Sequence, residues 1–226
     1  MKRIFFTIAG LLAVVSAFSV ELKSEGRDAQ YVESIVGRSQ KIVDKLGISD
    51  PAVAADVLNI IANRYFELND IYAEYDAAVA AVKESVADAE LKNRIVDGAK
   101  KMADSNLYRT HFAFPAALSI YLTDSQIEVV KDGMTFGVVG VTYTAYCDMI
   151  PTLTDEEKSQ SMAWLREARE LAMDASNSEN KHKVFGNYKG RINNYLSSRG
   201  YDLTSERAAW QQRIEQRQGA HACAGK

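Results

Sequence analysis

The stretch Asp50–Tyr75, DPAVAADVLNIIANRYFELNDIYAEY, decides the fold class. Its apolar residues recur every three or four positions, which is the spacing of one face of an α-helix. They are Val53, Val57, Ile60, Ile61, Leu68, Ile71 and Tyr75. Asp50 followed by Pro51 is typical of a helix start, because aspartate caps free amides and proline fits the first turn. The stretch therefore predicts one helix of roughly thirty residues, longer than most globular helices.

Helical spacing continues on both sides of this stretch. Apolar residues between Val32 and Leu46 predict a helix that ends at Gly47. A third helix is expected around Leu91–Met102, where apolar residues again recur every three or four positions. We expect Pro115 to interrupt the segment that follows, because proline has no amide hydrogen to donate.

Two threonines predict further helix starts. Thr123 stands three residues before Gln126, and Thr154 stands three residues before Glu157. In this pattern the hydroxyl accepts from a free amide while the later side chain reaches back to the threonine amide. Further helices are expected after Val139, over residues 155–175, around Tyr188–Leu196 and after a cap at Thr204.

The segment Lys131–Gly140, KDGMTFGVVG, is the least regular part of the chain. Three glycines crowd it, and MTFGV has strand propensity. The sequence as a whole predicts an all-α protein of six to eight helices in one bundle-like domain, with room for one short extended element near residues 133–138.

Length and composition bound the class of protein. The chain has 226 residues, of which 47% are apolar, so it can build the core of a single domain. Its formal net charge is −3, which disfavours binding to nucleic acid through phosphate neutralisation.

The first nineteen residues resemble a secretory leader. Lys2 and Arg3 precede an uncharged apolar run, and small residues at Ala17 and Ser19 fit cleavage after Ser19. The run is shorter than the ~20 residues that span a bilayer, so we expect no stable membrane anchor. We predict a signal peptide over residues 1–19, a helical domain over 24–217, a disordered tail over 218–226, and a periplasmic or secreted mature protein.

No sequence motif calls for a metal or another cofactor. The three histidines are far apart in sequence, and neither a phosphate-binding loop nor a nucleophile elbow is present. The cysteines, Cys147 and Cys223, are expected to stay unbridged, although export would permit a disulfide.

The stretch Asn187–Leu203, NYKGRINNYLSSRGYDL, is rich in groups that bind polar ligands. Between Asn180 and Tyr201 there are five cations and no acid. Charged forks and amides beside aromatic rings suit sugar hydroxyls and carboxylates. The alternative is a solvated basic face. The predicted ligand contacts are Arg109, Tyr143, Lys189, Arg191, Asn193, Asn194 and Tyr201.

Carboxylates define a second set of candidate residues. Glu167 and Asp174 lie two turns apart on one edge of the helix expected over 155–175, and Asp132 lies in the glycine-rich segment. Two carboxylates near one face are the groups that glycoside hydrolysis needs. The alternative is an ordinary amphipathic helix with Glu–Arg pairs.

Four blocks resemble a known secreted family. They are VKDGMTFGV from Val130, YTAYCDMIPTLTDEEK from Tyr143, WLREARELAMD from Trp164 and VFGNYKGRINNYLSSRGYDL from Val184. In this order they are similar to the domain-of-unknown-function family 3826 of Gram-negative polysaccharide degraders, over roughly Ala29–Leu203. The resemblance implies an exported protein of polysaccharide utilisation with a sugar-binding label, and it brings no established catalytic residues.

We therefore predict an exported carbohydrate-associated protein whose partner is an oligosaccharide or polysaccharide fragment, with acidic sugars as one class. One alternative is a polysaccharide-active hydrolase or lyase that uses Asp132, Glu167 or Asp174. Another is a helical protein-interaction module. A binder should show one polar and aromatic pocket without close carboxylates, whereas an interaction module should show an exposed apolar patch and no pocket.

Overall fold

The computed structural model of the protein describes residues 19–224, which contain eight helices and no β-strand. The helices are α1 (Ala29–Val43), α2 (Pro51–Ser85), α3 (Ala89–Leu118), α4 (Asp124–Met134), α5 (Val138–Met149), α6 (Asp155–Met173), α7 (Ser178–Ser198) and α8 (Leu203–Ala224). The all-α prediction is confirmed. No helix in the described range combines the length and apolar character that a membrane span requires.

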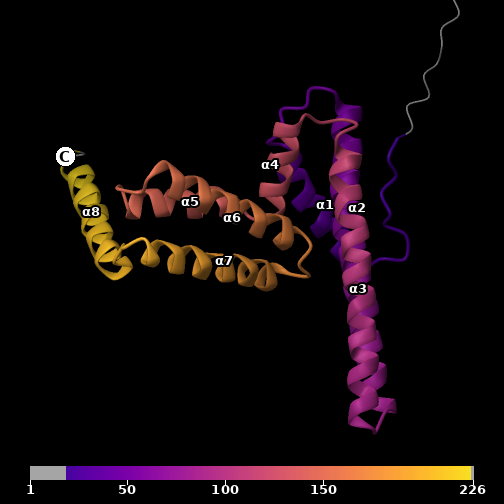
Figure 1. Cartoon of the computed structure of the whole chain (residues 1–226). Helices are drawn as coiled ribbons and strands as arrows, with labels where there is room; N and C mark the ends of the chain where they lie inside the picture. Colours follow the sequence, from indigo (N-terminus) through magenta and orange to yellow (C-terminus); the bar gives the residue numbers. More distant parts are fainter. Residues whose placement is uncertain (1–18, 225–226) are drawn as a thin grey trace, which may run out of the picture.

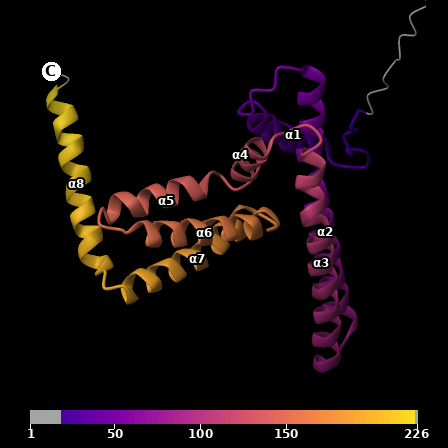
Figure 2. The ribbon, with the colours of Figure 1, turned by 45° about the horizontal axis from the view of Figure 1, so that its top comes forward.

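Helices α2 and α3 form a long antiparallel hairpin that extends well beyond the other helices (Figures 1 and 2). The sequence stretch that predicted α2 begins as expected. The Asp50 carboxylate accepts a hydrogen bond from the Ala52 amide at 2.8 Å, and Pro51 occupies the first turn. The 35 residues of α2 make it the longest helix of the fold.

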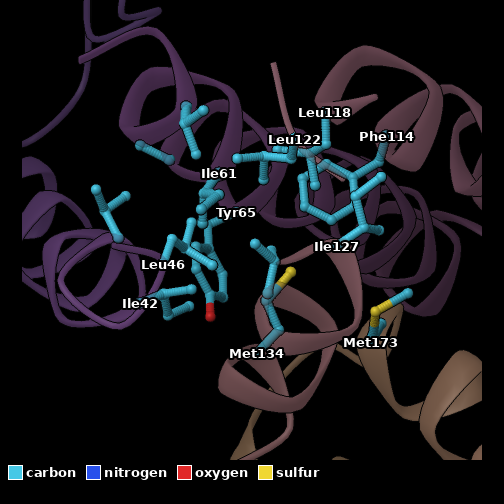
Figure 3. Close-up of a cluster of buried hydrophobic side chains, with 14 of the residues drawn as sticks. Ile42, Leu46, Ile61, Tyr65, Phe114, Leu118, Leu122, Ile127, Met134 and Met173 are labelled. Atoms are coloured by element: carbon cyan, nitrogen blue, oxygen red, sulfur yellow. The ribbon is translucent and has the colours of Figure 1, made fainter. Parts of the chain in front are cut away.

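A first core joins α1, α2, α3 and α4. Its buried side chains include Ile42, Ile61, Phe66, Leu118 and Met134, and it also takes in Met173 from the end of α6. Figure 3 shows Met134 and Met173 at the edge of this cluster. Helix α4 packs against both α1 and α6, so it connects the first core to the rest of the molecule.

A second core joins α5, α6 and α7, which project to one side of the hairpin (Figure 1). The predicted inward stripe of α7 is confirmed, because Ile192 and Leu196 are fully buried there. Helix α8 crosses the far end of these helices (Figure 2). The indole N–H of Trp210 on α8 donates to the Asp148 carboxylate on α5 at 2.7 Å. The protein is therefore built from two helical groups that share a seam.

The segment near residues 133–138 is a tight turn between α4 and α5 and contains no extended element. Phe136 and Gly137 both have positive φ, 60° and 66°, and the Gly137 amide donates to the Asp132 carbonyl at 2.8 Å. A left-handed turn of this kind closes a helix by satisfying its last carbonyls. Local strand propensity is overridden here by that capping geometry.

One of the three glycines in this segment, Gly133, lies where two helices pack closely. A Cβ atom added there would lie 2.8 Å from Cγ1 of Ile42 on α1. Glycine is therefore the residue that lets α4 approach α1 closely.

Two other expectations about helix ends differ from the structure. Pro115 lies inside α3 and does not interrupt it, because the missing amide falls near the last turn and the neighbouring Phe114 and Leu118 are buried in the first core. The start of α8 is capped by Asp202, whose carboxylate accepts from the Thr204 amide at 3.0 Å, and not by Thr204.

Helix α8 continues through Ala224, although the sequence predicted a tail from residue 218. Arg217 donates to the Asp148 carboxylate at 2.8 Å and so anchors α8 close to the predicted boundary. The side chains from residue 219 onwards, including that of Cys223, lie outside the described part of the structure. Cys147 on α5 is a free, half-buried cysteine.

Candidate functional site

A cavity of about 190 Å³ lies in the seam, where α1, α2, the turn after α4 and the start of α7 meet. Its polar and aromatic lining residues are Tyr31, Ser34, Arg38, Tyr65, Asn69, Phe136, Ser176, Asn177, Ser178 and Lys181. None of the described residues that line it is an aspartate or a glutamate. We call this space the Lys181 cavity.

Lys181 is the most unusual side chain of the cavity. It is only 5% exposed, and its ammonium donates to the backbone carbonyls of Met134 at 3.1 Å and Met173 at 3.3 Å. No carboxylate of the described residues lies within ion-pair distance of it. Burial, and then the charges of Arg38 and Arg64, lower the pKa of Lys181 to about 8, while the more distant carboxylate of Asp174 opposes them. The ammonium is therefore mostly charged at neutral pH and has no carboxylate within ion-pair distance in the described structure, an arrangement that an anion in the cavity would stabilise.

Two further sources of positive potential face the same space. The guanidinium of Arg38 lies 5.5 Å from the ring centre of Tyr65, and no ion pair or side-chain hydrogen bond holds it within the described residues. Asn177 is the N-cap of α7 and accepts from the Asn180 amide at 2.9 Å. The start of α7 therefore adds the positive end of a helix dipole to the cavity wall.

Aromatic rings supply the apolar part of the wall. Burial raises the pKa of Tyr65 to about 12, so its phenol stays neutral and able to donate at neutral pH. Phe136 is 49% exposed, and its ring stacks on His182 with centres 5.6 Å apart and planes 15° apart. Its positive φ is uncommon for a residue with a side chain, and it sets this ring beside the start of α7. An exposed ring beside polar groups is a surface on which a sugar ring can stack.

The charged residues beside the cavity, unlike Lys181, form ion pairs with one another in a network between the hairpin and α6. Arg64, which is 3% exposed, donates to Asp174 at 2.6 Å and to Glu67 at 2.6 Å. The other carboxylate oxygen of Asp174 lies 2.7 Å from Nδ1 of His111. The hydrogen bond to Asp174 is the main cause of the raised pKa of His111. This set therefore joins α2, α3 and the end of α6.

A second part of the network joins α4 to α6. Arg169, also 3% exposed, donates to Asp132 at 2.8 Å and to Glu128 at 2.6 Å. Lys131 donates to Glu170 at 3.0 Å. Each of these cations has at least one carboxylate partner, so we call the whole set the paired seam.

The three predicted carboxylates do not converge on one point. Asp174 and Asp132 belong to the paired seam, where they bind Arg64 and Arg169. Glu167 lies on the exposed side of α6, 3.5 Å from Arg191. Each one therefore has a cationic partner from a different part of the fold.

The predicted ligand contacts are spread over several surfaces, and none of them lines the Lys181 cavity as the structure describes it. Lys189, Arg191 and Asn194 are exposed on α7, where Arg191 lies 4.6 Å from the ring centre of Trp164. Asn193 is half-buried and accepts from the Tyr146 hydroxyl at 2.7 Å.

The remaining predicted contacts lie elsewhere. Tyr201 donates to Glu157 at 2.8 Å near the start of α6, and Tyr143 is half-buried against the second core. Arg109 on α3 lines a wider groove of about 720 Å³ between the hairpin and residues 20–27. That groove is also lined by the carboxylates of Glu21, Glu67, Asp70 and Glu74, which disfavour an anion there.

Sequence reasoning identified only part of the cavity. Lys181 and Phe136 lie in two segments that attracted attention, the basic region and the glycine-rich segment, and the structure brings these segments together. The contact is made by the first turn of α7 and not by the stretch Asn187–Leu203. Arg38 and Tyr65 gave no signal, because an arginine on an exposed face and a tyrosine in an apolar stripe are ordinary in helices.

Comparison with known proteins gives one positive finding. No curated protein matches the chain. Residues 32–216 match the model of a family described as "Protein of unknown function (DUF3826)", and because this match covers most of the chain, the protein belongs to that family.

Proposed function

We propose that the protein is exported and binds an acidic oligosaccharide, with a sugar carboxylate held in the Lys181 cavity. The observation that carries the proposal is the buried ammonium of Lys181, which has no carboxylate partner among the described residues. A buried charge without a counterion is costly, so a ligand that supplies the counterion gains affinity from relieving that cost.

The cavity offers two different ways to hold a carboxylate. The planar guanidinium of Arg38 can donate two parallel hydrogen bonds, while Lys181 acts as a compact point charge. The positive end of α7 adds to both. Sulfate or phosphate groups share part of this chemistry, and a uronate is favoured by the aromatic and amide groups around it.

The remaining wall suits a sugar more than a simple anion. Asn69, Ser176 and Ser178 offer hydrogen bonds to hydroxyls, and Phe136 offers a ring face. The volume of about 190 Å³ is smaller than the roughly 300 Å³ or more of pockets for drug-sized ligands. The cavity is therefore suited to one sugar unit, and the rest of the oligosaccharide would lie outside it, beyond Phe136.

Export is the second part of the proposal. It is supported by the basic start, the apolar run and the small residues before Val20, which together have the layout of a secretory leader. The resemblance to a secreted family of polysaccharide degraders agrees with it.

The test is calorimetric titration with uronate oligosaccharides and with neutral oligosaccharides of the same length. Arg38→Ala should weaken binding of the acidic ligands about ten- to a hundredfold, because a hydrogen bond to a charged group contributes about 1.5–3 kcal/mol. Binding of the neutral ligands should change little.

Arg191→Ala is the matched control, since it removes an exposed arginine from the surface of α7 that the sequence indicated. It should leave both affinities unchanged. If Arg191→Ala weakens binding and Arg38→Ala does not, the site is the α7 surface and the cavity assignment fails. If no acidic sugar binds the parent protein, the proposed function fails.

A specific observation favours a lyase as the second candidate. Lys181 and Tyr65 line the same cavity, and a lyase needs a base for the proton beside the uronate carboxylate and an acid for the leaving oxygen. The lysine amine, with its lowered pKa, fits the first role and the neutral phenol fits the second. Appearance of an unsaturated uronate product in the ultraviolet, and its loss in Tyr65→Phe, would establish this activity.

Hydrolysis and a protein-interaction role have weaker support. Hydrolysis would need a free pair of carboxylates, yet Asp132, Glu167 and Asp174 each face a cation. An interaction module is favoured by exposed apolar residues on α3, such as Tyr108 and Phe112, but the presence of a polar and aromatic cavity favours a binder.

A further inference from the structure

The segment Ser19–Ser24 lies along α2 and is held there by side chains from one face of that helix. The Asp56 carboxylate accepts from the Val20 amide nitrogen at 2.7 Å. Asn59 donates to the Val20 carbonyl at 2.8 Å. Asn63 donates to the Glu21 carbonyl and accepts from the Lys23 amide, both at 2.8 Å.

These contacts go to backbone atoms, so they do not depend on the side chains of the bound segment. Positions 56, 59 and 63 recur every three or four residues and therefore share one face of α2. The Arg27–Asp70 pair, with contacts of 2.6 and 2.7 Å, continues the attachment farther along the same helix. The face of α2 thus binds the backbone of residues 20–23 in one direction, with Val20 at one end.

Asp56 is the unusual member of this set. It is only 8% exposed, and no cation lies within ion-pair distance of it in the described part of the chain. Its neighbours are the Val20 nitrogen, the Ser19 hydroxyl at 3.4 Å and the Tyr121 phenol. Burial, and then the hydrogen bond to Asp56, raise the pKa of Tyr121. A buried carboxylate normally has a cationic partner or several hydrogen bonds.

Asp56 relies on hydrogen bonds, and a cation to pair with it can come from the chain itself. The leader pattern places cleavage between Ser19 and Val20. Hydrolysis of that peptide bond consumes one water, leaves a carboxylate on Ser19 and turns the Val20 nitrogen into an α-amine. The amine is protonated at neutral pH for the most part, since its ordinary pKa is about 7.7–8.0. The charge would then appear on the same nitrogen that already lies 2.7 Å from Asp56.

We propose that α2 carries a docking site for the processed N-terminus, in which the Val20 ammonium formed by leader removal pairs with buried Asp56. Processing then stabilises the fold, because it places a cation beside Asp56, which has none within ion-pair distance among residues 19–224. The site is separate from the Lys181 cavity, and it stands or fails independently of sugar binding.

The first part of the test identifies the N-terminus. The full precursor is produced in a Gram-negative host, and the exported protein is sequenced from its N-terminus. We expect the mature chain to begin at Val20. A chain that keeps its leader, or begins at any residue other than Val20, overturns the proposal.

The second part compares the chain that begins at Val20 with a chain that begins at Ala17. Asp56→Asn should lower the melting temperature of the Val20 chain by about 6 °C or more, because it removes one partner of a buried ion pair. In the Ala17 chain the same change should cost no more than about 2 °C, because an amide nitrogen can still donate to asparagine. Asp70→Asn is the matched control, and it should affect both chains equally. Equal effects of Asp56→Asn on the two chains overturn the proposal.

The reactivity of the Val20 amine provides a second readout that does not depend on stability. At pH 7 an acylating reagent should modify the paired amine about tenfold or more slowly than it modifies the amine of the Asp56→Asn chain, since one unit of raised pKa leaves tenfold less free amine. Equal rates in the two folded chains show an unpaired N-terminus and overturn the proposal.

Discussion

The paired seam and the Lys181 cavity contain equally buried cations with opposite surroundings. Arg64 and Arg169 are each 3% exposed, and each binds two or more carboxylates. Lys181 is 5% exposed and binds only backbone carbonyls within the described structure. Burial alone therefore does not distinguish a cation with carboxylate partners from one without them.

The partners make the distinction. A buried cation with carboxylate partners holds two elements together, as Arg169 does for α4 and α6. A buried cation without a carboxylate adds to the cost of folding unless a ligand completes it. Comparing the two regions therefore contrasts residues expected to stabilise the fold with the residue proposed to bind a ligand, and each of the following measurements addresses that contrast.

The largest effect is expected for stability when a paired cation is removed. Arg169→Met should lower the free energy of unfolding by about 3–5 kcal/mol, toward the lower end because Asp132 and Glu128 are partly exposed. The urea midpoint at neutral pH measures this change.

Lys181→Met is the matched variant in the other region. It should cost less than Arg169→Met, about 1–3 kcal/mol at most, because it removes a buried charge that has no ion-pair partner but also leaves the Met134 and Met173 carbonyls without their donor. If both substitutions destabilise the protein equally, Lys181 is a structural cation like Arg169 and the comparison breaks down.

The pH dependence of stability sharpens the same comparison. The pKa of Lys181 in the folded protein is about 8, below its ordinary value of 10.5. Between these two pH values the unfolded chain binds more protons than the folded one, so the stability of the parent should rise with pH there. The free energy of unfolding of the parent, compared with that of Lys181→Met, should rise by about 3 kcal/mol at most over this range. Below pH 8 the difference between the two proteins should not change with pH.

Melts of the parent and of Lys181→Met across this pH range test that expectation. Other titrating groups are common to both proteins, so only the difference between them reports on Lys181. A difference that does not vary from pH 8 to pH 10.5 would show that the ammonium is not destabilised by its surroundings.

Binding should respond in the opposite direction. The affinity for a uronate should be constant below about pH 8 and fall above it, as the ammonium loses its proton. Lys181→Met should lose about 1.5–3 kcal/mol of binding free energy at neutral pH and lose the pH dependence as well. Titration calorimetry at several pH values measures both, and a variant that binds as tightly as the parent would remove Lys181 from the site.

The fold could be predicted from sequence because it depends on local patterns. The apolar stripe in Asp50–Tyr75 and the capping boxes at Thr123 and Thr154 are each encoded within a few neighbouring residues, and both capping boxes are present in the structure. The turn around Phe136 was predicted only as an irregular or extended bend, because a positive φ is uncommon for a residue with a side chain and no local pattern indicates it at Phe136.

The candidate site was only partly predictable, for a related reason. The cavity is formed by residues from four segments, and the distance in sequence between Arg38 and Lys181 exceeds anything that a local pattern can relate. The cations that cluster in sequence, Lys189 and Arg191, are exposed on α7 and lie outside the cavity. Charge density along the chain therefore indicated a helix that contributes to the cavity, but not the part of that helix that lines it.

The smallest effect is expected at His111, a cation that has its carboxylate partner. The hydrogen bond to Asp174 raises its pKa, with Glu170 adding to the effect while burial and Arg64 oppose it. A histidine with a raised pKa stabilises the fold fully below its ordinary pKa, and this contribution is lost as the pH rises through the folded value. His111→Gln should therefore cost about 1 kcal/mol more at pH 6 than at pH 9. His182→Gln is the control, because His182 is exposed, stacks on Phe136 and has no carboxylate partner within the described residues. If His111→Gln costs the same at both pH values, Asp174 does not pair with a charged imidazole, and Arg64 alone accounts for the cationic side of that part of the seam.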